Sequence, residues 1–302
     1  MTEDPRYEKD PAIRTVRALI QCFLGDHVEG MFRLTQVYEA LNAKDAAEKT
    51  AVRKGISRER QAGNIVSTGT YGVWRKVESD VEWYGMGDEV SDLPPPLNIV
   101  LPLGLDSMVK LYPGDLVCFA GLTSSGKSSA SLEIALKNNS GLALNYLSSE
   151  LTLAAIQQRA ELVDIMLSSL KHVRFAMRYD HFEDVIEPGA INFVDYLQPS
   201  GDGDEPKYYS IPHMIMKIHK KLNGSGLVIL NIQKDPGKES GEGGFKTMHK
   251  ANLYITMDKA ENSSKFWMNI KKCKVRPSLE GYRMQYKPEP FGLKSCSDWI
   301  PL

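Results

Sequence analysis

The chain has 302 residues, of which 42% are hydrophobic and 25% are charged, and its formal net charge is −1. This composition excludes a largely disordered chain and suits one large or two modest globular domains. The near-neutral charge argues against a histone-like coating protein, although a local basic face could still bind nucleic acid.

The sequence also disfavours a membrane protein and a protein stabilised by disulfide bonds. No apolar run approaches the length of a membrane span and no signal-peptide pattern is visible, so we expect a soluble, cytoplasmic protein without membrane contact. Four scattered cysteines (Cys22, Cys118, Cys273 and Cys296) form no C-x-x-C pair. We therefore expect them to be reduced, with neither a zinc site nor a disulfide framework.

Residues 1–85 form the first predicted domain, which is small and α+β. Apolar residues at helical spacing predict a helix over 11–24, and a second helix is expected over 34–42. Residues 46–63 are basic and compatible with a third helix, and 64–78 alternate around a Gly-Thr pair as a β-hairpin does. This order of three helices and a hairpin resembles a winged helix-turn-helix domain.

The third predicted helix carries the charges that would face DNA under this resemblance. Such residues typically contact phosphates, and the candidates are Arg53, Lys54, Arg58 and Arg60. Acidic residues interrupt the run, so an alternative is a solvated helix face on a domain that docks on protein partners.

A linker is predicted at residues 86–97, which read MGDEVSDLPPPL. Glycine, acidic residues and three consecutive prolines support neither a helix interior nor a central strand. We therefore expect a second, larger domain over residues 98–302.

Residues 121–128 read GLTSSGKS and match the phosphate-binding loop pattern G-x-x-x-x-G-K-[ST]. A strand of buried type at 116–120 precedes the motif, and a segment of helical composition at 129–137 follows it, as the motif requires. The pattern predicts binding of a nucleoside triphosphate, taken as ATP, although the sequence gives no base preference. The alternative is a chance Ser/Gly loop.

Each residue type in this loop has a physical role. Glycines let the backbone N–H groups surround the phosphates without Cβ clashes, and the N-terminus of the following helix faces the same anion. Lys127 would reach the β- and γ-phosphates, and the Ser128 hydroxyl would bind Mg²⁺. The predicted nucleotide-binding residues are Gly121, Thr123, Ser124, Ser125, Gly126, Lys127, Ser128 and Ser129.

Apolar segments recur after the loop with helices between them, as in a parallel sheet whose site lies at the carboxyl ends of its strands. The predicted strands are 142–147, 191–195, 227–232, 253–257 and 266–271. The first three end in polar residues, which we expect to meet at the nucleotide.

These strand ends supply the candidate catalytic and metal-binding groups. Glu150 could orient and partly deprotonate the attacking water, or it could cap the helix that starts near Thr152. Asp195 has the position of a Walker B carboxylate that would hold Mg²⁺ together with Ser128. Gln233 could sense the γ-phosphate through a hydrogen bond.

Residues 235–250 read DPGKESGEGGFKTMHK and follow the third of these strands. The segment is rich in glycine and lysine, and we expect it to be mobile and too polar to pack in the core. Lys238, Lys246 and Lys250 are its candidate DNA-binding residues.

Over roughly residues 100–287 the chain resembles the RecA superfamily, and within it the core of the DnaB-type replicative helicases. PLGLDSMVKLYPGDLVCFAGLTSSGKSS is similar to the opening pattern of the superfamily, and INFVDYLQP is close to the DnaB-type DYLQ box. NYLSSELT looks like the strand that ends in the catalytic glutamate, so the resemblance favours Glu150 as the base. It implies a RecA-like α/β core with a parallel sheet, and ATP and Mg²⁺ as cofactors.

Lys274 and Arg276 lie two residues apart on a segment of β type. In DnaB-like rings, a Lys-x-Arg pair at this place reaches the γ-phosphate held by the neighbouring subunit. The resemblance therefore implies that this pair stabilises the transferred phosphoryl group in trans. The alternative is a surface basic cluster, because Lys271 and Lys272 make the strand lysine-rich.

The resemblance implies an ATP-hydrolysing DNA motor, a helicase-like replication protein that acts on single-stranded DNA as a hexameric ring or a filament. The chain lacks the helical N-terminal domain of DnaB-type helicases, and its sensor strand reads LNIQKD where the family usually has a Ser-Gln pair. The segment 235–250, in the place of the helicase-type DNA loop, is also unusually rich in Gly and Glu. The sensor strand and this segment bear on processive unwinding more than on hydrolysis. The alternatives are a recombinase or repair ATPase that forms filaments on DNA, and a nucleotide-switched DNA-binding regulatory protein.

Overall fold

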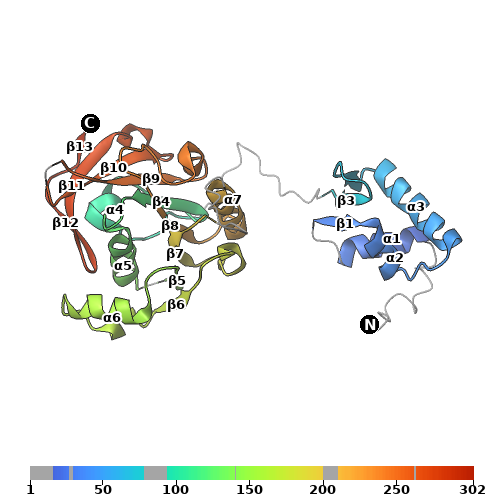
Figure 1. The fold of residues 1–302 in the computed structure, drawn as a ribbon, viewed down its shortest axis with the longest axis horizontal. Coiled ribbons are helices and arrows are strands. Elements are labelled where there is room, and N and C mark those ends of the chain that lie inside the picture. Colours follow the sequence, from blue (N-terminus) through green and yellow to red (C-terminus); the bar gives the residue numbers. More distant parts are fainter. Residues whose placement is uncertain (1–15, 27–29, 78–93, 140, 200–209, 262) are drawn as a thin grey trace. The chain divides into compact units, whose positions relative to one another are not determined.

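The computed structural model describes residues 16–26, 30–77, 94–139, 141–199, 210–261 and 263–302. The chain folds into two units, Met1–Glu89 and Val90–Leu302 (Figure 1). Most of the predicted linker lies outside the described residues, and its last part, 94–97, contains neither helix nor strand. No helix in the described part of the chain is long and apolar enough to cross a membrane.

The first unit contains helices and short strands. Its described elements are α1 (Val16–Asp26), β1 (Met31–Arg33), α2 (Leu34–Ala40), α3 (Ala46–Gln61), β2 (Ile65–Ser67) and β3 (Val73–Lys76). The strands form an antiparallel sheet in the order β1-β3-β2. The three helices and the β2–β3 hairpin agree with the sequence predictions, although residues 11–15 of the first predicted helix lie outside the described residues.

The core of this unit lies between α1 and α3. Gly55 lies in the middle of α3, and a Cβ added to it would lie 2.3 Å from Cδ1 of Ile20 on α1. The glycine therefore permits close helix packing, and it does not interrupt the helix. Phe23 and Phe32 pack edge to face beside this contact, with ring centroids 5.8 Å apart.

Glu59 is a buried carboxylate on α3 that links this helix by hydrogen bonds to α1 and to the residue before β2. It accepts hydrogen bonds from Nε of Arg17 (2.9 Å), Nε2 of Gln21 (3.4 Å) and Nδ2 of Asn64 (2.6 Å). Burial raises the pKa of Glu59, but the hydrogen bonds from Asn64 and Arg17 outweigh burial and leave the pKa below its ordinary value of 4.5.

Glu59→Gln is expected to reduce the stability of the first unit at neutral pH by about 1 kcal/mol, because it weakens these charge-assisted hydrogen bonds. Since the folded-state pKa lies below the unfolded one, the carboxylate stabilises the fold above the unfolded-state pKa. That contribution is lost as the pH falls through the folded-state pKa. Denaturant unfolding at several pH values should therefore show a flatter acid limb for the variant, whereas the exposed-residue control Glu39→Gln should behave as wild type.

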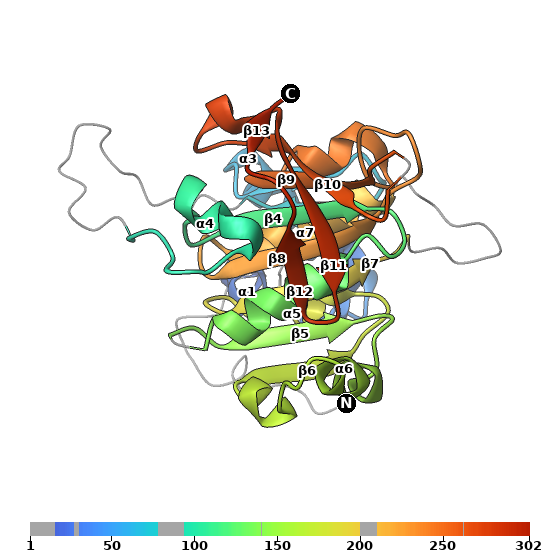
Figure 2. The ribbon, with the colours of Figure 1, turned by 90° about the vertical axis from the view of Figure 1, so that its left-hand side faces the viewer.

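The second unit is a three-layer α/β domain around one large sheet (Figure 2). Among its described residues, nine strands follow the order β12-β11-β10-β9-β4-β8-β7-β5-β6, and a tenth strand, β13, pairs with β11. The strands are β4 (Asp115–Gly121), β5 (Leu144–Ser148), β6 (Val173–Met177), β7 (Ile191–Leu197), β8 (Leu227–Gln233), β9 (Leu253–Lys259), β10 (Phe266–Cys273), β11 (Tyr282–Glu289), β12 (Gly292–Ser295) and β13 (Ile300–Pro301).

The sheet is parallel from β9 to β6 and antiparallel from β10 to β12. All five strands predicted after the phosphate loop are present. The last of them, β10, is antiparallel to β9, which corrects the expectation of a wholly parallel arrangement. The connection between β9 and β10 is too short for a crossover, so the chain must turn back.

Helices cover both faces of the sheet. One face packs against α4 (Leu105–Met108), α5 (Lys127–Lys137) and α6 (Leu153–Glu161), and the other packs against α7 (Ser210–Leu222). In Figure 2, α5 and the β11–β12 hairpin lie over the first face. Every residue of β4 is buried, which explains why central strands read as continuous apolar runs.

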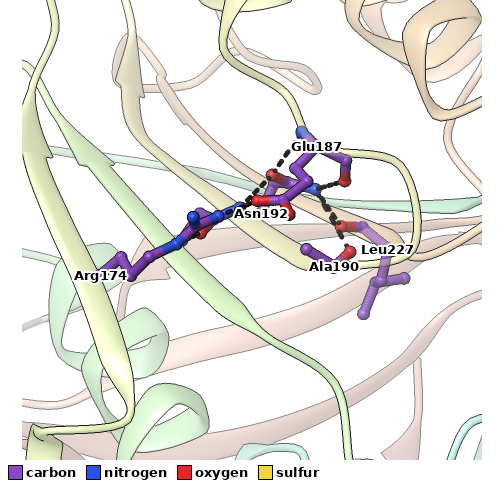
Figure 3. Close-up of polar contacts among 6 residues, drawn as sticks. Arg174, Glu187, Ala190, Asn192 and Leu227 are labelled. Carbon is purple, nitrogen blue, oxygen red and sulfur yellow. Dashed lines mark hydrogen bonds and ion pairs between the residues drawn. The ribbon is translucent and has the colours of Figure 1, made fainter.

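A polar network fixes the amino-terminal ends of β5, β6 and β7 (Figure 3). Nδ2 of the buried Asn192 donates to the carbonyl oxygens of Glu187 (3.0 Å) and Ala190 (3.2 Å). Asn145 donates to Oδ1 of Asn192 over 3.1 Å, and Arg174 donates to Oδ1 of Asn145 over 2.7 Å and pairs with Glu187. The opposite, carboxyl-terminal ends of these strands remain available for a site.

Candidate nucleotide-binding site

The predicted phosphate loop is a turn between β4 and α5 at the carboxyl edge of the sheet. Gly126 has a φ of 92°, and a Cβ added there would lie 2.9 Å from Cβ of Pro288. At Gly121 a Cβ would lie 2.4 Å from Oγ of Ser125. Both glycines are therefore required by backbone conformation or close approach, as the motif predicts.

Lys127 begins α5 and lies beneath the loop. Its Nζ donates to the carbonyl oxygens of Gly121 (2.9 Å) and Leu122 (3.0 Å) and to Oε1 of Gln233 (3.0 Å). Burial lowers the pKa of Lys127 to about 8, against the raising effect of Asp195 and other nearby carboxylates. Phosphates placed in the loop would favour the charged ammonium and raise this pKa again.

Ser128 and Asp195 form the candidate metal site. Oγ of Ser128 donates to Oδ1 of Asp195 over 3.0 Å. Hydroxyl and carboxylate oxygens suit Mg²⁺, which usually takes only one or two protein ligands and completes its shell with water and phosphate oxygens. Among the described residues, no group of three or more His, Cys, Asp or Glu side chains is placed to hold a metal ion.

Glu150 follows β5 and stands exposed on the wall of the same cleft. The N-cap of α6 is Thr152, whose Oγ1 accepts a hydrogen bond from the backbone N–H of Ala155 over 3.2 Å. The capping alternative for Glu150 is therefore wrong. Its side chain lines the same cleft as Lys127, Ser128 and Asp195.

Gln233 ends β8 between the lysine and the loop. Its Oε1 accepts from Lys127, and its Nε2 donates to Oγ1 of Thr123 over 2.6 Å. The amide thus bridges both sides of the phosphate loop, a position from which it could respond to an occupied γ-phosphate site.

These side chains line one cleft of about 470 Å³, a volume suited to a small-molecule ligand. The predicted residues on its wall are Thr123, Ser124, Gly126, Lys127, Ser128, Ser129, Glu150, Asp195 and Gln233. Gly121 and Ser125, also predicted to bind nucleotide, are buried and do not line the cleft. The carbonyl of Gly121 holds Lys127, and the carbonyl of Ser125 accepts from the Tyr286 hydroxyl over 2.6 Å.

Four further residues that no sequence pattern singled out complete the cleft wall, namely Arg159, Tyr196, Pro288 and Pro290. The two prolines belong to the β11–β12 hairpin, which is held against α5 by a hydrogen bond from the N–H of Leu293 to Oε2 of Glu133 (2.9 Å). Tyr196 directly follows Asp195, so its place in the DYLQ box was the one signal available for it. Arg159 lies on α6, where its spacing from Glu150 alone gives no reason to single it out.

Lys274 and Arg276 do not lie in this cleft. Because β10 is antiparallel to β9, its last residue, Cys273, pairs with the first residue of β9, at the edge of the sheet opposite the phosphate loop. The N–H of Lys274 donates to the carbonyl of Asn252 over 2.9 Å, and Nη1 of Arg276 reaches the carbonyl of Met108 at 3.4 Å. The pair lies after the end of β10 and outside any strand, which corrects the predicted β-type segment.

The lysine-bearing segment after β8 is exposed only in part. Lys238, Lys246 and Lys250 are exposed, as is Phe245 at 71%. Lys234, by contrast, is 3% exposed and forms an ion pair with Asp258.

The centre of the same segment is packed against the sheet, which corrects the expectation that it is too polar to pack. The N–H of Glu242 donates to the carbonyl of Gln233 over 2.7 Å, and the N–H of Gly241 donates to the Tyr254 hydroxyl over 2.9 Å. Thr247 and Met248 are buried in the short 3-10 helix η5 (Gly244–Met248). The segment is thus attached to the strand that ends at the nucleotide cleft.

The basic residues predicted on α3 are all exposed. Nε of Arg53 donates to the hydroxyl of Tyr38 over 2.7 Å, and the guanidinium of Arg60 lies 5.8 Å from the ring centroid of Trp74. Lys54 and Arg58 complete this exposed basic set.

No protein-family model matches this sequence, and no curated protein matches it either. Among solved structures, the KaiC-like protein PH0186 from Pyrococcus horikoshii OT3 is similar, with a TM-score of 0.54 and 18% sequence identity. The match covers 67% of this chain and 99% of that one. The second unit has a RecA-like α/β fold, as the sequence predicts.

Two further solved structures are similar at lower TM-scores. The RadB recombinase has a TM-score of 0.48 at 15% identity and covers 63% of this chain and 94% of its own. The flagellar accessory protein FlaH from Methanocaldococcus jannaschii has a TM-score of 0.45 at 15% identity, covering 61% of this chain and 90% of its own. At 18% identity, the likeness to the KaiC-like protein establishes the fold alone, because one fold supports many chemistries.

Proposed function

We propose that this protein binds ATP with Mg²⁺ and hydrolyses it as a DNA-dependent motor of the DnaB/RecA type. The observation that carries the proposal is convergence: Lys127 and Ser128 of the phosphate loop meet Glu150 and Asp195, which come from two other strand ends, in one cleft. This set supplies a phosphate-binding cation, two metal ligands and a carboxylate base.

Each of these residues has a role in the proposed hydrolysis. Lys127 binds the β- and γ-phosphates, while Ser128 and Asp195 hold Mg²⁺, which neutralises phosphate charge when bound. Glu150 orients a water for in-line attack on the γ-phosphate and accepts its proton. Gln233 contacts the γ-phosphate and transmits its presence to the segment that follows β8.

We propose that the first unit is a winged-helix-like domain. Its element order and the β2–β3 hairpin support this assignment, and the exposed basic side chains of α3 suit contact with DNA phosphates or with an acidic partner. In the second unit, Lys238, Lys246 and Lys250 are the proposed contacts with single-stranded DNA. The segment that carries these lysines is hydrogen-bonded to the backbone of Gln233. Binding or hydrolysis of the nucleotide would therefore change how tightly the lysines bind DNA.

The proposed active form is a homo-oligomer, either a hexameric ring or a filament. Lys274 and Arg276 are exposed at the edge of the sheet opposite their own nucleotide cleft. They can therefore act on a γ-phosphate only when that edge faces the cleft of a second copy. A head-to-tail arrangement of this kind closes into a ring or continues as a helix.

ATP hydrolysis with and without single-stranded DNA, combined with electron microscopy in a nonhydrolysable ATP analogue, tests this proposal. We expect DNA to raise the rate of hydrolysis and to promote assembly. A closed six-fold ring would support the helicase-like motor, and an open helix would support the recombinase alternative. A monomer or dimer under all conditions would contradict both, and tight DNA binding without turnover would favour the regulatory switch.

A further inference from the structure

The candidate metal ligand Asp195 is 1% exposed and receives three hydrogen bonds. Its Oδ2 accepts from the hydroxyl of Tyr146 over 2.6 Å. Its Oδ1 accepts from Nδ2 of Asn231 over 2.8 Å and from Oγ of Ser128 over 3.0 Å. Ser128 belongs to the proposed metal site, whereas Tyr146 and Asn231 take no direct part in the proposed hydrolysis.

Three adjacent strands bring these groups together. Tyr146 lies in β5, Asp195 in β7 and Asn231 in β8, and all three side chains lie on the face of the sheet that packs against α5. The regular pairing of β7 with β8 ends at Val194 and resumes at Leu197. Asp195 therefore lies where the pairing with β8 is irregular, although it remains paired with Ser148 of β5, and side-chain hydrogen bonds hold its carboxylate.

Both donors are themselves held firmly. The ring of Tyr146 is 1% exposed and lies between Phe193 and Phe175, with ring centroids 5.4 Å and 6.2 Å away. Asn231 is fully buried, and its Nδ2 also donates to Oγ of Ser131 on α5 over 3.0 Å. A carboxylate bound by two such groups has little freedom to rotate.

The chemical nature of the donors matters as well. A phenol and an amide are neutral, so they orient the carboxylate without offsetting the negative charge that attracts a cation. A lysine or arginine in their place would compete with Mg²⁺ for that charge. Apolar residues would avoid the cost of burying a hydroxyl and an amide but would leave the carboxylate unpaired in the core.

We propose that Tyr146 and Asn231 are positioning residues of the metal site, which hold the Asp195 carboxylate in the orientation that binds Mg²⁺ together with Ser128. This inference rests on the proposed function, since it concerns the metal that accompanies the nucleotide. It assigns the two residues an effect on metal affinity and not on the binding of the nucleotide alone.

Tyr146→Phe is the direct test, because it removes one oxygen and keeps the aromatic stack. Binding of Mn²⁺ to the full chain with a nonhydrolysable ATP analogue is followed by electron paramagnetic resonance. We expect the Mn²⁺ affinity of the variant to fall by about 10-fold or more, as is typical when an outer-shell partner is lost. Affinity for the analogue without metal should stay within about twofold of wild type. Asn231→Leu should show the same pattern.

Tyr254→Phe is the matched control. Its hydroxyl is also buried and hydrogen-bonded, to Gly241 and Thr247, but the residue packs in the core on the other face of the sheet. If Tyr146→Phe is folded and lowers Mn²⁺ affinity no more than Tyr254→Phe does, the inference is overturned and Tyr146 is structural only. If wild type binds no analogue with or without metal, the proposed function fails instead.

Discussion

Glu150→Gln is expected to lower the rate of ATP hydrolysis by about 10²–10⁴-fold while ATP affinity stays within about twofold of wild type. The substitution keeps the size of the side chain but removes the group that accepts the proton of the attacking water. Because Glu150 is exposed on the cleft wall and Thr152 caps α6, loss of the carboxylate should not disturb the helix. Single-turnover hydrolysis and fluorescent-nucleotide binding measure the two quantities separately.

The control for this prediction is Glu161→Gln, a substitution of the last residue of α6. Glu161 accepts a hydrogen bond from Gln157 over 3.0 Å and does not line the cleft, so its variant should hydrolyse ATP as wild type does. If Glu150→Gln hydrolyses ATP at the wild-type rate, Glu150 is not the catalytic base. A parallel loss of ATP affinity would assign it to binding rather than to chemistry.

The nucleotide cleft could be predicted largely from sequence because its signals are local. Gly121, Gly126 and Lys127 belong to one continuous loop whose conformation demands those residue types. Glu150 follows an apolar strand, and Asp195 and Gln233 lie near the ends of two others. Parallel strands bring their carboxyl ends to one edge. The same local logic identified the three helices and the hairpin of the first unit.

The parts that escaped prediction depend on contacts distant in sequence. Strands β11 and β12 turn at Pro290 and Phe291, a pair without the usual signal of a tight hairpin, and β11 contains Pro288. Their place over the phosphate loop depends on Tyr286 reaching Ser125, which no spacing rule reveals. Hence Pro288 and Pro290 could not be assigned to the cleft.

The roles of buried polar side chains could not be predicted from the sequence either. In the sequence, Tyr146 and Asn231 stand inside apolar strands and look like ordinary core residues. Only the pairing of β5, β7 and β8 shows that both face Asp195. Likewise, the glycine-rich composition of residues 235–250 concealed the attachment of Gly241 to the Tyr254 hydroxyl.

Arg276→Ala is expected to lower the rate of ATP hydrolysis by about 10³–10⁵-fold, the range in which an arginine finger acts. The residue lies at the opposite edge of the sheet from its own phosphate loop, so the loss must come from the neighbouring copy. Lys220→Ala, which removes an exposed charge on α7, should leave the rate unchanged. Equal rates for wild type and Arg276→Ala would favour the surface-cluster alternative.

Mixed oligomers distinguish action in trans from action in cis. Lys127→Ala retains an intact Arg276, and Arg276→Ala retains an intact phosphate loop, so co-assembly of the two inactive variants should restore hydrolysis. Restoration is expected at about one interface in four, since only one pairing of the two copies joins both intact halves. Co-assembly of Lys127→Ala with Glu150→Gln should restore nothing, because both lesions fall in the half-site that binds the nucleotide. Recovery in that control pair, or none in the first pair despite verified mixed assembly, would show that the site is not divided between subunits in this way.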